Sequence, residues 1–272
     1  MREGIAIILP IILPFAIAIL SIFFWWKRNV QLVLNAIGAA GLLITSCLLF
    51  YTVLGHEIVS VQVGNWPAPF GITLVCDYFS AIMILATGIL GAGAAIYSMV
   101  SMDNARISYG YFPLFYFLMM GINGAFLAGD IFNLYVWFEL VLISSFVLIA
   151  LGSERAQLEG AIKYVTLNLF ASIIFLTAVG MLYGAMGALN MADLAVKVSQ
   201  SEYQGILLVI SVFFFIAFGI KAALFPLFFW LPASYHTPPV AVSALFAGLL
   251  TKVGVYALIR VFTLIFPQQA QE

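Results

Sequence analysis

The stretch that decides the fold is FGIKAALFPLFFWLPASYHTPP, residues 218–239, in which one lysine and four prolines interrupt a run of apolar residues. Lys221 lies near the middle of an apolar segment, 204–231, that is long enough to cross a membrane as a helix, which takes roughly 20 residues. Pro226 cannot donate a hydrogen bond to the carbonyl of Ala222, and its ring clashes with that carbonyl. We therefore predict a membrane helix that is broken here rather than one with an ordinary proline kink.

The whole chain has the composition of a membrane protein. Of its 272 residues, 65% are apolar and only 8% are charged, whereas a soluble domain is about half apolar and a quarter charged. The formal net charge of −1 argues against a nucleic-acid partner, because binding one takes a basic patch. Cys47 and Cys76 each lie in an apolar run and there are two histidines, so we expect no disulfide framework, metal site or cofactor.

Eight apolar segments are long enough to span a membrane, and no segment indicates a soluble domain. The first ends in an aromatic pair and two cations (25–28), as spanning helices do at the membrane interface. No small-residue cleavage site follows it, so we interpret it as a retained helix rather than a signal peptide. The approximate ranges are 4–26, 30–54, 73–100, 108–128, 131–152, 161–187, 204–231 and 239–265.

Cations in the connecting segments predict the orientation in what we expect to be the cell membrane. The longest of these segments, 55–72 and 188–203, are short enough to be loops or surface helices. The positive-inside rule places the N-terminus outside and the turn at 27–29 in the cytoplasm. One side carries Lys27, Arg28, Arg106 and Arg155, and the other carries Arg2 and Lys197.

Three ionisable side chains, Glu139, Lys221 and Lys252, are predicted to lie at mid-depth in the fifth, seventh and eighth spans. A charge there costs about 2.5–3.5 kcal/mol on insertion scales. One interpretation is a static ion pair, with the second lysine reaching for the interface, although a stem of about 6 Å is short against a half-thickness of about 15 Å. We favour proton transfer, because desolvation lets a carboxyl and an amine exchange protons near neutral pH.

His236 is the fourth candidate, in the segment YHTPP between the seventh and eighth spans. An imidazole titrates near neutral pH, so this side chain could relay protons between Lys221 and Lys252. It could equally belong to a helix cap, since Thr237 followed by Pro238 is typical of a helix start. The residues alone favour neither role.

The other charges are predicted to have structural or surface roles. Asp77 either faces an outer vestibule or bonds to neighbouring backbone, and Asp130 caps the fifth span. Lys163 either reaches the interface or pairs with an acid, and Arg260 lies at the interface. The remaining charges considered are expected to be solvated in loops: Glu57, Asp103, Glu154, Arg155, Glu159 and Asp193.

The arrangement of charged residues and prolines resembles that of a known family. It consists of Asp130 and Glu139 on one span, Lys221 with Pro226 on another, and Lys252 after YHTPP. The family comprises the antiporter-like membrane subunits of respiratory complex I, membrane hydrogenases and Mrp-type cation/proton antiporters. The stretches GDIFNLYVWFE (129–139) and FWLPASYHTPPV (229–240) are most similar to the D subunits of Mrp-type antiporters. The resemblance runs over essentially the whole chain.

The resemblance implies an all-α membrane fold of about 14 helices with two inverted five-helix repeats. This chain would supply about eight of them: an N-terminal three-helix segment (1–107), the first repeat (108–266) with its broken seventh helix, and a truncated tail (267–272). Glu139, Lys221, Lys252 and His236 would form the proton pathway. Because the later helices are absent from this sequence, we do not expect this stretch to transport ions alone.

The implied activity is exchange of external protons for internal Na⁺, Li⁺ or K⁺, driven by the proton gradient. The partners would be the other antiporter subunits, and neither ATP nor a redox cofactor would be needed. The alternative is a proton-pumping subunit of an NADH:quinone oxidoreductase or a membrane hydrogenase, without its own redox site. A purely structural scaffold is the third possibility, and the three mid-depth charges weigh against it. On the favoured interpretation the chain is part of a transporter rather than an enzyme.

Overall fold

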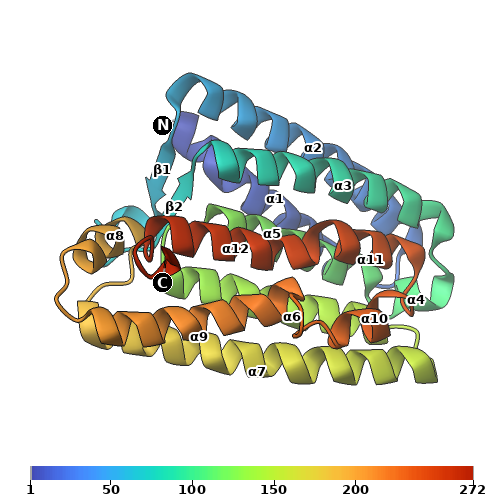
Figure 1. Cartoon of the computed structure of the whole chain (residues 1–272). Coiled ribbons are helices and arrows are strands. Elements are labelled where there is room, and N and C mark those ends of the chain that lie inside the picture. The colour runs from blue at the N-terminus through green and yellow to red at the C-terminus, as the bar shows by residue number, and fades with distance from the viewer. Residues whose placement is uncertain (1, 272) are drawn as a thin grey trace.

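A computed structural model describes residues 2–271 as helices packed side by side in alternating directions (Figure 1). Each of the eight expected spans contains an apolar helix, which confirms the all-α membrane fold. Met1, part of the N-terminus predicted to lie outside, and Glu272, the last residue of the predicted tail, lie outside the described residues. Among the described residues, seven helical segments are long and apolar enough to span a membrane: α1 (Arg2–Phe23), α2 (Arg28–His56), α3 (Tyr78–Ser101), α6 (Ile131–Ala150), α7 (Arg155–Met186), α9 (Gln204–Ala222) and the run from α11 (Val240–Leu245) to α12 (Thr251–Leu264). The fourth expected span contains a shorter apolar helix, α5 (Tyr111–Leu127).

The connecting segments gather at two ends of the molecule, with both termini at one of them (Figure 1). We call that end the hairpin end, because it carries a β-hairpin, and the opposite one the loop end. At the loop end, the indole Nε1 of Trp25 donates to the carbonyl of Ser108 at 2.9 Å, and Arg106 pairs with Glu154 at 3.1 Å. The four cations expected to share one side of the membrane therefore do lie at one end.

The segment 55–72, expected to be a loop or surface helix, instead begins a hairpin. Strand β1 (Val59–Gln62) pairs antiparallel with β2 (Thr73–Cys76), and valine and threonine favour such pairing. The expected third span therefore started too early, since its helix begins only after Asp77. At the same end, 188–203 contains the expected surface helix, α8 (Met191–Ser199).

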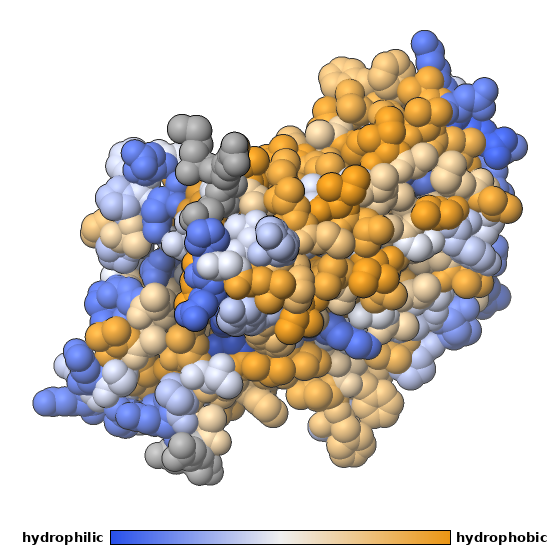
Figure 2. All heavy atoms as spheres, turned by 90° about the horizontal axis from the view of Figure 1, so that it is seen from above, coloured by the Kyte–Doolittle hydropathy of each residue, from blue (hydrophilic) through white to orange (hydrophobic). Residues whose placement is uncertain are grey.

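The outer faces of α2 and α3 expose apolar side chains. On the face seen in Figure 2, apolar side chains cover the middle of the molecule and hydrophilic ones lie toward its two ends. Ile82, Ile89 and Ile96, two helical turns apart on α3, are 54%, 55% and 59% exposed. A continuous face of this kind promotes aggregation in water and is compatible with a bilayer.

Inside α1, a proline removes one backbone hydrogen bond. Pro14 has no N–H to donate to the carbonyl of Pro10. The amide Nδ2 of Asn123, a buried side chain on α5, donates to that carbonyl at 2.8 Å. This bond satisfies a backbone group that lipid would leave unpaired.

Replacing Asn123 with leucine is expected to destabilise the protein by about 1–3 kcal/mol, because the carbonyl of Pro10 then stays buried without a donor. The measurement is thermal unfolding of the full-length protein in detergent. Asn29→Ala, at an exposed position in the first turn of α2, serves as the control and should leave the melting temperature unchanged. Equal melting of Asn123→Leu and the wild type would contradict this account of α1.

The seventh span is broken, as predicted, and the break is a helix end rather than a kink. Helix α9 stops at Ala222, Ala223 has a positive φ of 56°, and Leu224 N donates to Gly219 O at 2.9 Å. With Ala223 N donating to Ile220 O at 3.1 Å, this is the hydrogen-bond pattern of a Schellman motif. A proline three residues further on is typical of such an end. The chain becomes helical again only at α10 (Trp230–Tyr235).

Candidate functional site

The break in α9 is held by the two elements that follow it. The indole Nε1 of the buried Trp230 donates to Ile220 O at 2.8 Å, a second hydrogen bond to the carbonyl that already accepts from Ala223 N. Gly254 on α12 lies directly against the break, since a Cβ there would come within 2.5 Å of the backbone N of Ala222. Backbone polar groups at membrane depth are tolerated only when protein or water covers them in this way.

Lys221 is enclosed by three helices and is 5% exposed. Its Nζ donates to Ser172 Oγ, on α7, at 3.1 Å. The same nitrogen lies 4.9 Å from the centroid of the Phe138 ring, on α6, and a cation over an aromatic face is stabilised electrostatically. The amine is therefore bonded to a neutral hydroxyl and a ring rather than to a carboxylate.

Glu139 follows Phe138 on α6 and interacts electrostatically with Lys221. Its Oε1 is buried and has no hydrogen-bond partner among the described residues. A buried polar atom without a partner is costly, so this oxygen has unused capacity to accept a hydrogen bond. The structure thus brings together two of the four predicted site residues, without joining them in a direct ion pair.

A small cavity of about 10 Å³ lies beside Lys221, which is room for about one water molecule. Tyr164 and Asn168 from α7 contribute polar groups to its wall. The hydroxyl of Tyr164 also shares a hydrogen bond of 2.6 Å with Ser145 Oγ. The amine of Lys221 therefore borders a narrow, partly polar space.

Lys252 lies where the eighth span changes its helical geometry. A π-helical turn, η2 (Phe246–Leu250), separates α11 from α12, and Lys252 follows it directly. Its Nζ donates to Ala247 O, and its side chain is exposed on the surface of the described chain. π turns are rare and frequently occur at functional sites. Lys252 thus has the predicted place in the sequence of the span but does not enter the enclosed space around Lys221.

His236 lies at the loop end, as the C-cap residue of α10. Its ring is exposed, and Nδ1 makes a 2.5 Å hydrogen bond with Pro232 O. The ring therefore caps the end of α10, while α11 begins after Pro239 rather than at Thr237. Like Lys252, the histidine is separate from the enclosed pair.

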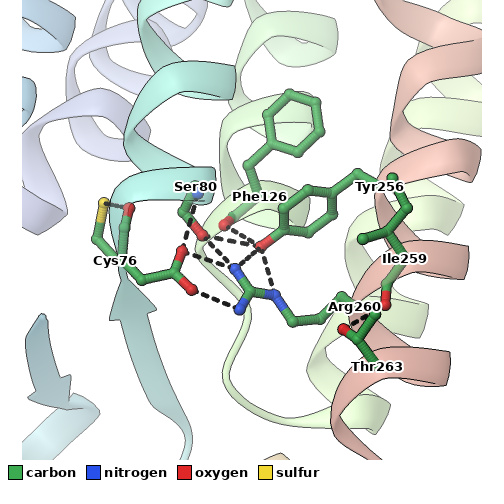
Figure 3. Close-up of polar contacts among 8 residues, drawn as sticks. Cys76, Ser80, Phe126, Tyr256, Ile259, Arg260 and Thr263 are labelled. Atoms are coloured by element: carbon green, nitrogen blue, oxygen red, sulfur yellow. Dashed lines mark hydrogen bonds and ion pairs between the residues drawn. The ribbon is translucent and has the colours of Figure 1, made fainter. Parts of the chain in front are cut away.

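A second polar cluster, at the hairpin end, was not predicted. Arg260 on α12 donates from two nitrogens to the two carboxylate oxygens of Asp77, at 2.6 and 2.7 Å (Figure 3). Asp77 also caps α3 by accepting from Ser80 N at 2.9 Å, which confirms the predicted bond to neighbouring backbone. Burial alone would raise the pKa of Asp77, but the hydrogen bonds from Arg260 and Ser80 outweigh it and lower the pKa from 3.8 to about 2.

The other charges mostly form local or surface contacts. Asp130 accepts from Asn133 N at 2.8 Å and caps α6, as predicted. Lys163 pairs with Glu159 at 2.6 Å, so the expected alternative of an acidic partner is correct. Glu159 lies in α7 rather than in a loop, because that helix begins at Arg155, six residues earlier than expected.

Comparison with known proteins gives matches along nearly the whole chain. Residues 128–272 match the family described as NADH:quinone oxidoreductase/Mrp antiporter, TM. The chain is 46% identical over 260 residues to a protein of Alkalihalophilus pseudofirmus named as the D subunit of a Na(+)/H(+) antiporter, covering 96% of this chain and 53% of that protein. It is 42% identical over 272 residues to a Rhizobium meliloti protein named as the probable D subunit of a K(+)/H(+) antiporter, with coverage of 96% and 49%.

Two solved structures have the same fold. A chain of the Mrp complex from Dietzia sp. superposes with a TM-score of 0.88 at 28% identity, covering 98% of this chain and 50% of that one. A chain of the membrane-bound sulfane sulfur reductase, an archaeal respiratory membrane complex, superposes with a TM-score of 0.88 at 26% identity, with coverage of 99% and 55%. The chain spans about half the length of the curated relatives and solved chains that it matches.

Proposed function

Since this chain belongs to the NADH:quinone oxidoreductase/Mrp antiporter membrane family, we propose that it is a proton-translocating D subunit of a multisubunit cation/proton antiporter. One observation carries the proposal: the buried Lys221 bonds to Ser172, while the partly exposed Glu139, which acts on it electrostatically, keeps one buried oxygen without a hydrogen-bond partner among the described residues. A static pair would join the two charges directly. Here each group can gain or lose a proton without breaking a bond to the other.

The chemistry of the pair follows from electrostatics. Desolvation of Lys221 favours the neutral amine, whereas the charge of Glu139 favours the ammonium form. If the carboxylate is protonated, its attraction disappears and the lysine can release its proton. The water-sized cavity beside Lys221 offers a place for a molecule that accepts it. We include Lys252 and His236 in the same pathway, as exposed groups that would meet protons arriving from elsewhere.

We also propose the partners, the membrane and the orientation of this chain. Its partners would be other antiporter subunits, because the named relatives are subunits and both solved neighbours are chains of complexes. We propose a plasma membrane as its location. The cations at the loop end favour a cytoplasmic position for that end. We also propose the division into an N-terminal segment (1–107), a first repeat (108–266) and a tail (267–272).

A proton-pumping subunit of an NADH:quinone oxidoreductase or a related respiratory complex is the second candidate. The family description covers both kinds of complex, and the archaeal respiratory complex matches as well as the Mrp complex by TM-score. The higher identity to proteins named as antiporter subunits favours the first candidate. In the first case the proton gradient drives the exchange of protons for cations; in the second, electron transfer elsewhere in the complex moves the protons.

Replacing Glu139 with glutamine is expected to lower cation-driven proton movement by about 100-fold, the low end of what a positioned proton-transfer group contributes. Glutamine keeps the size of the side chain but removes the charge that acts on Lys221. The assay uses the full-length chain with its partner subunits in membrane vesicles, with a pH-sensitive dye and added Na⁺ or K⁺.

The matched control is Glu159→Gln, which removes an exposed carboxylate from α7 and should leave the rate unchanged. Wild-type exchange in Glu139→Gln would contradict the proposed role of this residue. A wild-type complex that moves protons only when electrons are supplied to it, and not on addition of either cation, would instead establish the second candidate.

A further inference from the structure

Arg260 is bonded far more extensively than an interfacial arginine needs to be. Its guanidinium makes five hydrogen bonds, two to Asp77, one to Ser80 and two to the hydroxyl of Tyr256 (Figure 3). The side chain is only 18% exposed, and that of Asp77 is 26% exposed. Two parallel bonds between a guanidinium and a carboxylate fix direction as well as distance. The group is therefore held in one orientation.

The cluster joins α12 to two other helices. Asp77 and Ser80 belong to the start of α3, and Tyr256 OH donates to Phe126 O, in the last turn of α5, at 2.8 Å. The ring of Tyr256 lies between those of Phe79 and Phe126, at 4.9 Å from each centroid. The hairpin-end half of α12 is thus fixed on two sides by polar bonds and by one stacked and one edge-to-face ring contact.

The other end of α12 packs through Gly254 against the break in α9, but it has no ion pair among the described residues. It follows the π-helical turn η2, where the wider spacing of hydrogen bonds interrupts the regular α-helix. The chain stays helical from Val240 to Leu264, and the π turn offsets the rotation of α12 relative to α11, an offset that tertiary contacts must hold in place. Lys252 is in the first turn after η2, and Arg260 lies eight residues further, about 12 Å along the axis at 1.5 Å per residue.

We propose that Arg260 is a positioning residue, whose ion pair with Asp77 sets the rotation of α12 and thereby the place of Lys252 and of Gly254 against the break in α9. This inference rests on the proposed function, because it assigns Arg260 to the support of that same site. Arg260 itself touches neither Lys221 nor Glu139 in the described chain. It acts through α12, whose other end carries Lys252 and Gly254.

The test measures the position of α12 and the exchange rate in the same variants. Spin labels at Ile82→Cys on α3 and Ile259→Cys on α12, both exposed positions, report the spacing of the two helices in the full-length chain within its complex. Cys47 is exposed and is first replaced by serine. We expect one narrow distance distribution with Arg260 intact and a shifted or broader one in Arg260→Gln and in Asp77→Asn, since asparagine still caps α3.

The rate per assembled complex is expected to fall about 10-fold in each single variant. In the double variant the fold-loss should be smaller than the two single losses multiplied together, because both substitutions break the same ion pair. Arg260→Lys keeps the charge but loses the two-pronged geometry, so it should give intermediate values in both measurements. It also provides the test if Arg260→Gln fails to assemble. The matched control is Arg106→Gln, which breaks the more exposed ion pair at the loop end and should change neither quantity.

An unchanged label distance in Arg260→Gln or Arg260→Lys would overturn the inference. So would a rate that falls only in proportion to the amount of assembled complex, since the pair would then be a structural tie alone. If the wild-type complex exchanges no cation, the proposed function fails, and the label distances still decide whether Arg260 positions α12.

Discussion

Replacing Lys221 with arginine is expected to abolish cation-driven proton movement, although arginine keeps the positive charge of the side chain. An arginine in a protein does not lose its proton, so it could neither release one nor accept one at this position. Lys221 is bonded to Ser172 and lies over Phe138, and arginine could make both kinds of contact. The substitution therefore separates proton transfer from charge pairing.

The expected loss is at least about 100-fold, similar to that for removal of a general acid or base. Vesicles that contain the full-length chain and its partner subunits provide the measurement, with the amount of assembled complex determined in parallel. Lys163→Arg, in an exposed ion pair on α7, should keep the wild-type rate. If Lys221→Arg also kept it, Lys221 would be one half of a static pair and the proton pathway would have to run elsewhere.

Replacing Gly254 with alanine is expected to destabilise the protein by about 1–3 kcal/mol through overpacking and to impair transport as well. The new Cβ would lie 2.5 Å from Ala222 N and 2.8 Å from Lys221 C. These are backbone atoms of the helix end that carries the lysine, so they cannot move aside as a flexible side chain would. Relief of the clash must shift either α12 or Lys221.

Thermal unfolding in detergent and the vesicle assay together test this prediction. Gly205→Ala is the matched control, because nothing lies within 4 Å of a Cβ at that position in the first turn of α9. Its melting temperature should stay at or slightly above the wild-type value, since alanine favours helix more than glycine does. Wild-type melting and wild-type transport in Gly254→Ala would show that the break tolerates displacement.

The local features of this fold could be predicted from the sequence, because they depend on neighbouring residues. The length of each apolar run located the eight helices, and Pro226 beside Lys221 predicted the break. The hairpin was missed because only Asp77 separates Thr73–Cys76 from a longer apolar run, so the two stretches together predict one span. In the structure Asp77 divides them by capping α3.

The candidate site was only partly predictable, because its geometry depends on contacts between residues far apart in the sequence. The depth of Glu139 and Lys221 follows from their place in a span, but which way each side chain points depends on how the helices rotate against one another. The pairing of Asp77 with Arg260 joins residues 183 apart, and no pattern in a single sequence marks it.

The bond between Asn123 and Pro10 also gives this protein an order of assembly during synthesis. The two residues are 113 positions apart, so α1, α2 and α3 have left the ribosome before the donor for that carbonyl exists. Until α5 enters the bilayer, the first helix carries an unpaired backbone oxygen in a medium without water. The N-terminal helix thus completes its folding late, when a segment made well after it arrives, and a nascent chain stopped short of Asn123 would expose that incomplete helix to quality control.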